Sequence, residues 1–447
     1  MHTILETTGN KTQSMLGIPQ QEMDALLSLP YKETTLLRNL SFKNLQFAKK
    51  TLISLHKVLE EDLFHPRKDA RKRIKIAYRL IMANLVACVF QRKELSVSGT
   101  AKSYLRQEYL GKRFLTKRAV NKVLTALEDN KLIVRTKGNP LSKAVNKYLP
   151  TKQLEKLCLP LIYSVVESYD ERKLIVINPK KEAETERYYA NTFNIEDEQT
   201  LILPETHPDI VKLRRINEAL QKATFAFKSP ITRIYSNNDV MQGGRLYCAF
   251  QRLPDKRARI RINTLLNGLP CVEVDLSCNH PAMLMALNGL QLPRDWYSYI
   301  ASKANCNRNK VKFLVTRMIG AEDRSIDLRP STAKKSGIPL TDIPSICDRE
   351  QIEYVIADEF PELNKSLCKG GIGVFLQNLE GEILLNAMDE LVNQGILSLP
   401  VHDSLCVQYI FEKEAIDAIE KSWMNVLGVD FKPWIKVDYS DHLTNKP

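Results

Sequence analysis

The chain has 447 residues, of which 44% are hydrophobic and 26% charged. This composition is ordinary for a globular protein of about two to four domains, and it excludes a mainly disordered, collagen-like or coiled-coil chain. The formal net charge is +13, from 65 basic and 52 acidic residues.

Hydropathy and cysteine spacing narrow the class of protein further. The longest apolar run, at 81–90, contains Asn84 and is shorter than the roughly 18–20 residues that cross a bilayer. The N-terminus lacks the basic and then apolar pattern of a signal peptide, so we predict a cytoplasmic protein with no membrane partner. The cysteine number is odd and no C-x-x-C occurs, which favours reduced, mostly buried thiols over a disulfide framework or a zinc knuckle.

The positive charge is concentrated in one part of the chain. Residues 51–150 contain 22 basic and 8 acidic residues, a net charge of +14, and the rest of the chain is near neutral. A localised basic region most often binds a polyanion, so we predict nucleic acid as a partner. The alternative is a solvated basic surface that favours solubility.

In chain order, residues 1–65 are predicted to be a helical segment and 66–150 a basic winged helix-turn-helix domain. An amphipathic helix opens that domain, a second helix is expected near 101–109, and a third covers 116–128. A strand and a turn at Gly138 follow, as in a β-wing. Residues 151–230 are predicted to be a thumb-like or linker region.

The third helix carries the predicted nucleic-acid contacts of this domain. Thr116 is a good N-cap residue. One stripe of the helix is apolar, at Val120, Val123, Leu124 and Leu127. Polar and basic residues lie near its start, at Lys117, Arg118, Asn121 and Lys122. A basic helix in a winged helix can enter the major groove, although such domains also serve as protein-contact modules.

Two aspartates stand out in the C-terminal half. Asp275 ends a β-rich run that a helix-forming run follows. Asp403 follows His402 between two apolar runs, as expected where two strands of a hairpin meet at a turn. Two aspartates on adjacent strands can hold two Mg²⁺ ions, which stabilise the attacking and leaving oxygens in phosphoryl transfer. Each aspartate alone is a weak signal, since Asp is common at strand ends.

Between these aspartates lies a predicted helix with unpaired cations. Arg308 and Lys312 are one turn apart on the helix over 307–320. Such a pair is unfavourable by itself, but it is well suited to a triphosphate. The alternative is a basic face in solvent.

The order of these segments resembles motifs A, B and C of the DNA polymerase I family (family A), an order that the single-subunit phage RNA polymerases share. Asp275-Leu-Ser-Cys-Asn-His280 is similar to D-Y-S-Q-I-E, Arg308-x-x-x-Lys312 to R-x-x-x-K, and Val401-His-Asp-Ser404 to motif C. Two further stretches, at 243–254 and 377–388, resemble the G-R-L and Q-G-x-x-A-D-I-x-x-x-A-M segments of the family. The resemblance covers about residues 230–440.

This resemblance implies an α+β fold with a right-hand palm and fingers over 231–447. It also implies a role for each matching residue. Asp275 and Asp403 are expected to bind the metals, and Arg308 and Lys312 the incoming triphosphate, with Lys312 also as a proton donor. The residues expected to contact the template or primer are Arg245, Gln377 and His402.

Departures from the family pattern leave open whether the enzyme uses deoxyribonucleotides or ribonucleotides. His280 replaces the glutamate that acts as a steric gate in the DNA enzymes, and Ile319-Gly320 stands where the family has Tyr-Gly. Both His280 and Ile319 are therefore expected at the nucleotide. Ser404 matches the phage RNA polymerases. Motif A aligns with the DNA enzymes without a gap, which favours DNA synthesis slightly. No exonuclease-like D-x-E segment precedes the palm.

The sequence thus predicts a template-directed nucleic-acid polymerase that uses two Mg²⁺ ions, a nucleic-acid template and primer, and nucleoside triphosphates. One alternative is a non-catalytic DNA-binding replication initiator or regulator on a degenerate polymerase scaffold. Another is a different nucleotidyl transfer, such as template-independent tailing or primer synthesis. The sequence makes no prediction of oligomeric state.

Overall fold

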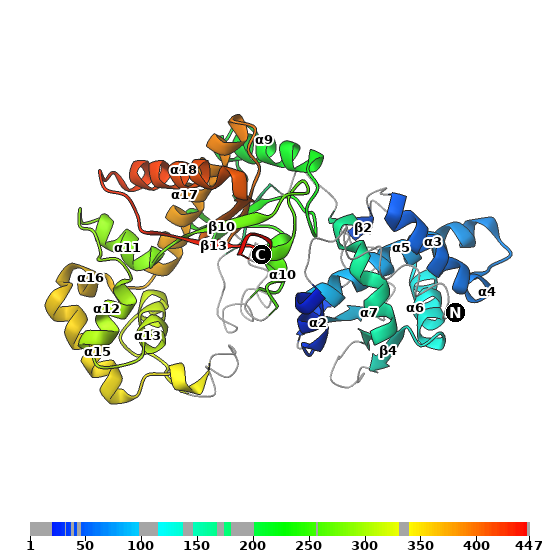
Figure 1. Ribbon diagram of the computed structural model, residues 1–447, viewed down its shortest axis with the longest axis horizontal. Coiled ribbons are helices and arrows are strands. Elements are labelled where there is room, and N and C mark those ends of the chain that lie inside the picture. Colours follow the sequence, from blue (N-terminus) through cyan, green and yellow to red (C-terminus); the bar gives the residue numbers. More distant parts are fainter. Residues whose placement is uncertain are drawn as a thin grey trace, which may run out of the picture.

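The computed structural model has an N-terminal and a C-terminal lobe of mixed α+β structure (Figure 1). The residues that the structure describes are 20–31, 33–36, 40–42, 46–97, 115–136, 146–167, 174–179, 201–255, 258–329 and 339–444.

The N-terminal lobe is built around one long helix and a small sheet. Its elements are α2 (Gln20–Ser28), β1 (Glu33–Leu36), β2 (Leu40–Phe42), α3 (Gln46–Val58), α4 (Glu60–Leu63), α5 (Lys68–Gln91), β3 (Lys93–Val97), α6 (Lys117–Asp129), β4 (Ile133–Thr136), β5 (Asn146–Pro150), α7 (Lys152–Cys158), η3 (Leu159–Ser164) and β6 (Val165–Glu167). The strand order of the sheet is β1-β3-β5-β4, with β1 parallel to β3 and the other pairs antiparallel.

Helix α5 is the core of this lobe. By length and composition it could cross a membrane, but 83% of its most apolar window is buried inside the protein. Burial of this kind is typical of the central helix of a packed lobe. The predicted apolar run at 81–90 is therefore core, and all of its residues are buried.

Helix α6 follows the predicted pattern. The side chain of Thr116 accepts a hydrogen bond from the backbone N–H of Ala119 (3.3 Å), which is an N-cap. The four apolar residues of the predicted stripe are buried. Strands β4 and β5 follow the helix, as expected for a hairpin. The predicted helix near 101–109 and the turn at Gly138 lie outside the described residues.

The segment at 1–65 is not wholly helical. Two short strands, β1 and β2, interrupt its described helices. Thr34 and Thr35 favour extended structure because they are β-branched, and β1 finds a parallel partner in β3. That partner is distant in sequence, so helical periodicity alone could not reveal the strand.

The C-terminal lobe holds the segments with predicted chemistry. Its elements are β7 (Ile175–Ile177), α9 (Pro208–Lys222), β8 (Thr232–Ser236), β9 (Asp239–Tyr247), η5 (Phe250–Arg252), α10 (Ile260–Asn263), β10 (Cys271–Leu276), α11 (Asn279–Ala286), α12 (Trp296–Lys303), α13 (Arg308–Gly320), η6 (Leu340–Asp342), α15 (Ile346–Glu359), α16 (Pro361–Ser366), α17 (Ile372–Asn393), β11 (Ser398–Val401), β12 (Ser404–Gln408), η7 (Tyr409–Phe411), α18 (Glu412–Leu427), β13 (Ile435–Tyr439) and α19 (Asp441–Thr444).

Its main sheet is antiparallel, in the order β11-β12-β10-β13. Along β10 the buried residues Val272, Val274 and Leu276 alternate with Glu273 and Asp275, which are partly exposed. Since successive side chains of a strand point to opposite faces, one face of the sheet packs into the core and the other presents carboxylates. Helices α12, α13, α15 and α16 form a separate helical region at one side of this sheet (Figure 1).

The segment at 151–230 contributes to both lobes. Strand β6 pairs with β2 in the N-terminal lobe. Strand β7 pairs in parallel with β8, and α9 packs on α17, in the C-terminal lobe. The domain boundaries at 65, 150 and 230 stay predictions.

All nine cysteines are free thiols, and six of them are buried. The prediction that most of the thiols are buried is confirmed.

Candidate active site

The two predicted metal-binding aspartates lie at the same end of neighbouring strands. Asp275 is in β10, directly opposite Ser404 in β12. Asp403 is in the tight turn that joins β11 to β12, and its carbonyl accepts a hydrogen bond from the backbone N–H of Leu276 (3.4 Å). The predicted hairpin is therefore confirmed, and it brings together two carboxylates that are far apart in the sequence.

The turn holds His402 in a rare backbone conformation. Its φ is +56°, in the left-handed region that non-glycine residues seldom adopt. Such a conformation persists only where the surrounding structure enforces it, and it is common at functional sites. Here it leaves the His402 side chain exposed beside Asp403.

Neither aspartate ionises as readily as an ordinary aspartate. Burial, Asp403 and Glu273 together raise the pKa of Asp275 to about 7, against the opposing effect of Lys312 and Lys436. Burial, and then the charge of Glu380, also raises the pKa of Asp403. Two carboxylates that resist ionisation side by side form a site that favours cations.

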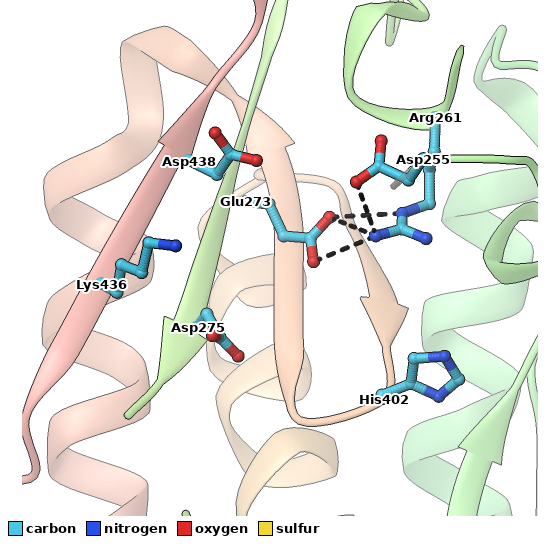
Figure 2. A pocket seen from close by; sticks show the side chains of 7 residues that line it. All are labelled: Asp255, Arg261, Glu273, Asp275, His402, Lys436 and Asp438. Atoms are coloured by element: carbon cyan, nitrogen blue, oxygen red, sulfur yellow. Dashed lines mark hydrogen bonds and ion pairs between the residues drawn. The ribbon is translucent and has the colours of Figure 1, made fainter. Parts of the chain in front are cut away.

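A cavity of about 380 Å³ opens on the carboxylate face of the sheet (Figure 2). Its lining residues are Asp255, Arg261, Glu273, Asp275, His402, Lys436 and Asp438. Glu273 is already engaged, because it forms an ion pair with Arg261 (3.0 Å) and accepts a hydrogen bond from the Ser404 hydroxyl (2.8 Å). Asp275 has no such partner among the described residues, so its carboxylate is left for a ligand.

Two unpaired lysines flank Asp275. Lys436 lies directly opposite it on β13. Lys312 is exposed on α13. Neither forms an ion pair with a described carboxylate, and both lower the pKa of Asp275.

The other predicted cation of α13 is paired. Arg308 forms an ion pair with Asp295 (3.0 Å) and lies over the ring of Tyr297, with 5.5 Å from its guanidinium carbon to the ring centre. Both partners of the ion pair are about half exposed, at 43% and 51%. Exposed pairs of this kind contribute roughly 0.2–1 kcal/mol, so a triphosphate could replace Asp295.

A buried glutamate connects three of the segments that carry the motif resemblance. Glu380 of α17 is 1% exposed, and its Oε1 lies 2.6 Å from Nε of Arg245 in β9. Its Oε2 lies 3.0 Å from Nη2 of Arg245, 3.0 Å from Nε2 of His280, and 3.1 Å from Nδ2 of Asn279. Arg245 and His280, 28% and 19% exposed, keep an accessible edge.

Glu380 is ionised at neutral pH. Burial acts to raise the pKa of its carboxyl group, but His280 and Arg245 outweigh this effect and hold the pKa below its ordinary value. Glu380, Arg245 and His280 all act in turn on the pKa of Asp403. The cluster is therefore an electrostatic neighbour of Asp403.

The remaining predicted residues lie at separate places. Gln377 is half-buried on α17, one turn from Glu380. Ile319 is buried at the end of α13, at 5% exposure, so it contributes to packing there. The predicted nucleic-acid contacts of α6 belong to the N-terminal lobe, where Lys117, Arg118 and Asn121 are exposed and Lys122 is half-buried.

Sequence reasoning missed three residues of this site: Glu380, Glu273 and Lys436. Glu380 lies inside the 377–388 segment but at a position where the family motif specifies no residue type. Glu273 could have been found from strand alternation, since it is two residues before Asp275 and so faces the same way. Nothing in the sequence pattern placed Lys436 opposite Asp275.

We expect Glu380→Gln to destabilise the protein by about 2–4 kcal/mol, because it leaves the half-buried charge of Arg245 without its buried partner. Urea denaturation of both proteins measures the difference. The matched control is Glu390→Gln on the same helix, whose ion pair with Lys421 (2.9 Å) is largely exposed and is worth at most about 1 kcal/mol. Equal losses in the free energy of unfolding from the two substitutions would contradict the stabilising role of the Glu380 cluster.

The residues at the site fit Mg²⁺. In the part of the chain that the structure describes, no group of three or more His, Cys, Asp or Glu side chains is arranged to hold a metal ion. Mg²⁺ does not need such a cage, because it prefers hard oxygen ligands and is often held by one or two carboxylates together with substrate phosphates and water. Asp275 and Asp403 supply such a pair, and the resistance of both groups to ionisation favours a bound cation.

Comparisons with known proteins give only weak likeness, and it is to solved structures. No protein-family model matches the chain, and no curated protein sequence matches it. Among solved structures, the chain is similar to the POL domain of Pol1 from M. smegmatis in a complex with DNA primer-template and dNTP. The identity is 12% and the TM-score 0.30, over 89% of this chain and 70% of that chain. A TM-score this low establishes no shared activity, so function must be argued from the residues of the site.

Proposed function

We propose that the chain is a template-directed nucleic-acid polymerase, with its active site at the end of the β10–β12 strand pair. The observation that carries this proposal is the juxtaposition of Asp275 and Asp403, with the unpaired Lys312 near Asp275. The order of the polymerase-like sequence motifs supports it. The reaction is attack of a primer 3′-hydroxyl on the α-phosphate of a nucleoside triphosphate, with release of pyrophosphate.

Asp275 and Asp403 would hold two Mg²⁺ ions. When bound, such ions stabilise the attacking and leaving oxygens of a phosphoryl transfer. The protein's own contribution is to hold the two carboxylates rigidly. Asp275 lies within a paired strand, and Asp403 lies in a turn that strands on both sides fix.

We assign triphosphate binding to α13. Lys312 is unpaired among the described residues and is free to contact phosphate oxygens, where it can also give a proton to the leaving pyrophosphate. Arg308 would exchange its exposed ion pair with Asp295 for the phosphate, which offers more charge and bidentate geometry.

Arg245, Gln377 and His402 are the proposed contacts to the template or primer, with His402 beside the primer terminus. His280 is the proposed direct nucleotide contact, and the buried Ile319 is proposed to shape the nucleotide site through the packing of α13. Buried Glu380 fixes the orientation of both Arg245 and His280. We favour DNA over RNA as the product, because motif A aligns with the DNA enzymes without a gap.

The N-terminal lobe is proposed to bind nucleic acid as a winged helix. The order α5, β3, α6, β4, β5 and the pairing of β3 and β4 with β5 support this assignment. The exposed Lys117, Arg118 and Asn121 and the half-buried Lys122 of α6 would contact the nucleic acid.

A primer-extension assay tests the proposal. Wild-type protein with Mg²⁺, a primed template and either dNTPs or NTPs is expected to extend the primer according to the template, and Asp403→Ala is expected to lose this activity. The preferred nucleotide identifies the product. Equal extension by wild-type protein and Asp403→Ala, or no extension with either nucleotide set, would overturn the proposal. Tight duplex binding without extension would then favour a non-catalytic DNA-binding protein.

A further inference from the structure

The exposed half of α5 carries a line of basic side chains that the proposed active site does not use. Lys68, Arg71, Lys75 and Arg79 are all exposed. They follow one another at intervals of three or four residues, so they lie along one side of the helix. At 1.5 Å of rise per residue, this basic stripe extends about 16 Å.

The basic stripe lacks compensating charge. None of its four residues forms an ion pair or a side-chain hydrogen bond with a described residue. Exposed lysines elsewhere in the protein do have carboxylate partners, as in Lys303–Glu359 (3.2 Å), Lys421–Glu390 (2.9 Å) and Lys432–Glu420 (2.6 Å). The stripe is therefore a run of four neighbouring exposed cations with no carboxylate partner among the described residues.

This arrangement is unfavourable for the isolated protein. Like charges four residues apart on a helix repel by about 0.2–0.5 kcal/mol per pair. Cations near a helix N-terminus also oppose the helix dipole. Asp69 is the single acidic residue of α5. A stripe that weakens its own helix is explained if a polyanion binds there.

The helix also presents the stripe rigidly. Its C-terminal half is buried in the core of the N-terminal lobe, and α5 packs against α6. The four cations therefore project from a fixed axis, and binding does not have to order the backbone that carries them.

We infer that the basic stripe of α5 binds the phosphodiester backbone of a duplex nucleic acid. Its cations recur about once per helical turn along one side of a rigid helix, and contacts of such cations with the phosphodiester backbone position a protein without reading sequence. The inference adds a second nucleic-acid surface to the one on α6. It rests on the proposed function for the choice of duplex nucleic acid as the polyanion.

The salt dependence of binding tests this inference. Fluorescence anisotropy of a labelled DNA duplex, titrated with the full chain from 50 to 300 mM KCl, gives the slope of log K against log salt concentration. Each phosphate contact contributes about 0.9 to this slope for B-DNA. The stripe variant carries four substitutions: Lys68→Ala, Arg71→Ala, Lys75→Ala and Arg79→Ala. It is expected to reduce the magnitude of the negative slope by about 3–4 and to weaken binding at least tenfold at 100 mM KCl.

A charge-matched variant controls for net charge. Lys303→Ala, Lys365→Ala, Lys421→Ala, Lys432→Ala removes the same charge from paired, exposed lysines of the C-terminal lobe. Its slope is expected to stay within about 0.5 of wild type. The charge reversal Arg71→Glu, Lys75→Glu is a second probe. It is expected to weaken duplex binding more than Arg71→Ala, Lys75→Ala, which only removes the same two charges.

Equal slopes for the wild type and the stripe variant would overturn the inference. Equal losses of duplex affinity in the stripe variant and the charge-matched control variant would also overturn it. So would loss of binding to phosphatidylserine vesicles with duplex binding unchanged, since the partner would then be a membrane surface. Primer extension is measured separately. If the wild type does not extend a primer but the stripe variant has a smaller slope magnitude, the result counts against the polymerase alone. If the wild type extends normally but the stripe variant has an unchanged slope, the result counts against the basic stripe alone.

Discussion

Asp275→Asn is expected to raise the melting temperature of the metal-free protein at pH 8 and, in the same protein, to remove nucleotide incorporation. The pKa of Asp275 is raised to about 7, so the folded state holds this proton to higher pH than the unfolded chain does. Stability must therefore fall as pH rises from about 4, the unfolded value, to about 7. A neutral amide of the same shape does not lose this stability. Above pH 7 the free energy of unfolding of Asp275→Asn is therefore expected to exceed that of the wild type by about 1 kcal/mol or more.

The gain in stability of Asp275→Asn over the wild type should depend on pH and on Mg²⁺. It is expected to be small at pH 4, where Asp275 is protonated in the folded state and still about half protonated in the unfolded chain, to grow up to pH 7 and to stay constant above it. Mg²⁺ should raise the melting temperature of the wild type more at pH 8 than at pH 6, because binding needs the ionised carboxylates. The same addition should affect Asp275→Asn much less. Incorporation should fall about a thousandfold, since the lost metal stabilises the transition state by several kcal/mol.

Differential scanning calorimetry between pH 4 and 8 measures the stability effect. Asp295→Asn is a suitable comparison, because the hydrogen bond from Ser298 and the charge of Arg308 hold the pKa of Asp295 below its ordinary value. That substitution should not stabilise the protein at pH 8. A lower melting temperature for Asp275→Asn than for wild type at pH 8 would show that Asp275 is a structural carboxylate and not one held for a cation.

Local sequence patterns predicted the elements that carry the candidate site. The β-rich run that ends at Asp275, the apolar runs around Asp403 and the cap at Thr116 each concern neighbouring residues, and each gave the observed element. The mixed α+β class was predicted from the resemblance of the motif order to the polymerase families. Short-range rules suffice here because hydrogen bonding and side-chain direction within one element depend on few residues.

The parts that could not be predicted depend on contacts across the fold. Whether Arg308 faces a phosphate or Asp295 is decided by the position of a separate helix. Glu380 became part of the site because α17 lies against β9, which brings Arg245 within 2.6 Å of it. The sequence does contain one sign of that contact, namely a glycine in the interior of a helix, where glycine costs about 0.5–1 kcal/mol relative to alanine.

That glycine, Gly381, is where a single methyl group should have the largest structural effect. A Cβ atom on Gly381 would lie 1.9 Å from the carbonyl oxygen and 2.8 Å from the carbonyl carbon of Gly244 in β9. Both are backbone atoms of a paired strand, so no side-chain rotation can relieve the overlap. Helix α17 must therefore move away from β9.

Such a movement would separate the buried contacts that depend on this packing. The ion pair of Arg245 with Glu380 spans the same two elements, and so does the hydrogen bond from Asn378 to the carbonyl of Val240 (2.7 Å). Loss of close packing together with a buried ion pair is expected to reduce stability by about 4 kcal/mol or more. The melting temperature should fall by roughly 8 °C or more, on the scale of a 150–250-residue domain.

Two other glycines make the test specific. Gly244→Ala should be intermediate, because its Cβ would approach the Tyr235 ring at 2.9 Å and its φ of +77° is strained for alanine. Gly320→Ala should be neutral or slightly stabilising, since a Cβ there meets nothing within 4 Å and alanine favours the helix. Thermal unfolding of the three variants should therefore rank Gly381→Ala below Gly244→Ala and Gly244→Ala below Gly320→Ala. A wild-type melting temperature for Gly381→Ala would mean that α17 does not rest directly on β9, and the placement of Glu380 beside Arg245 and His280 would fail with it.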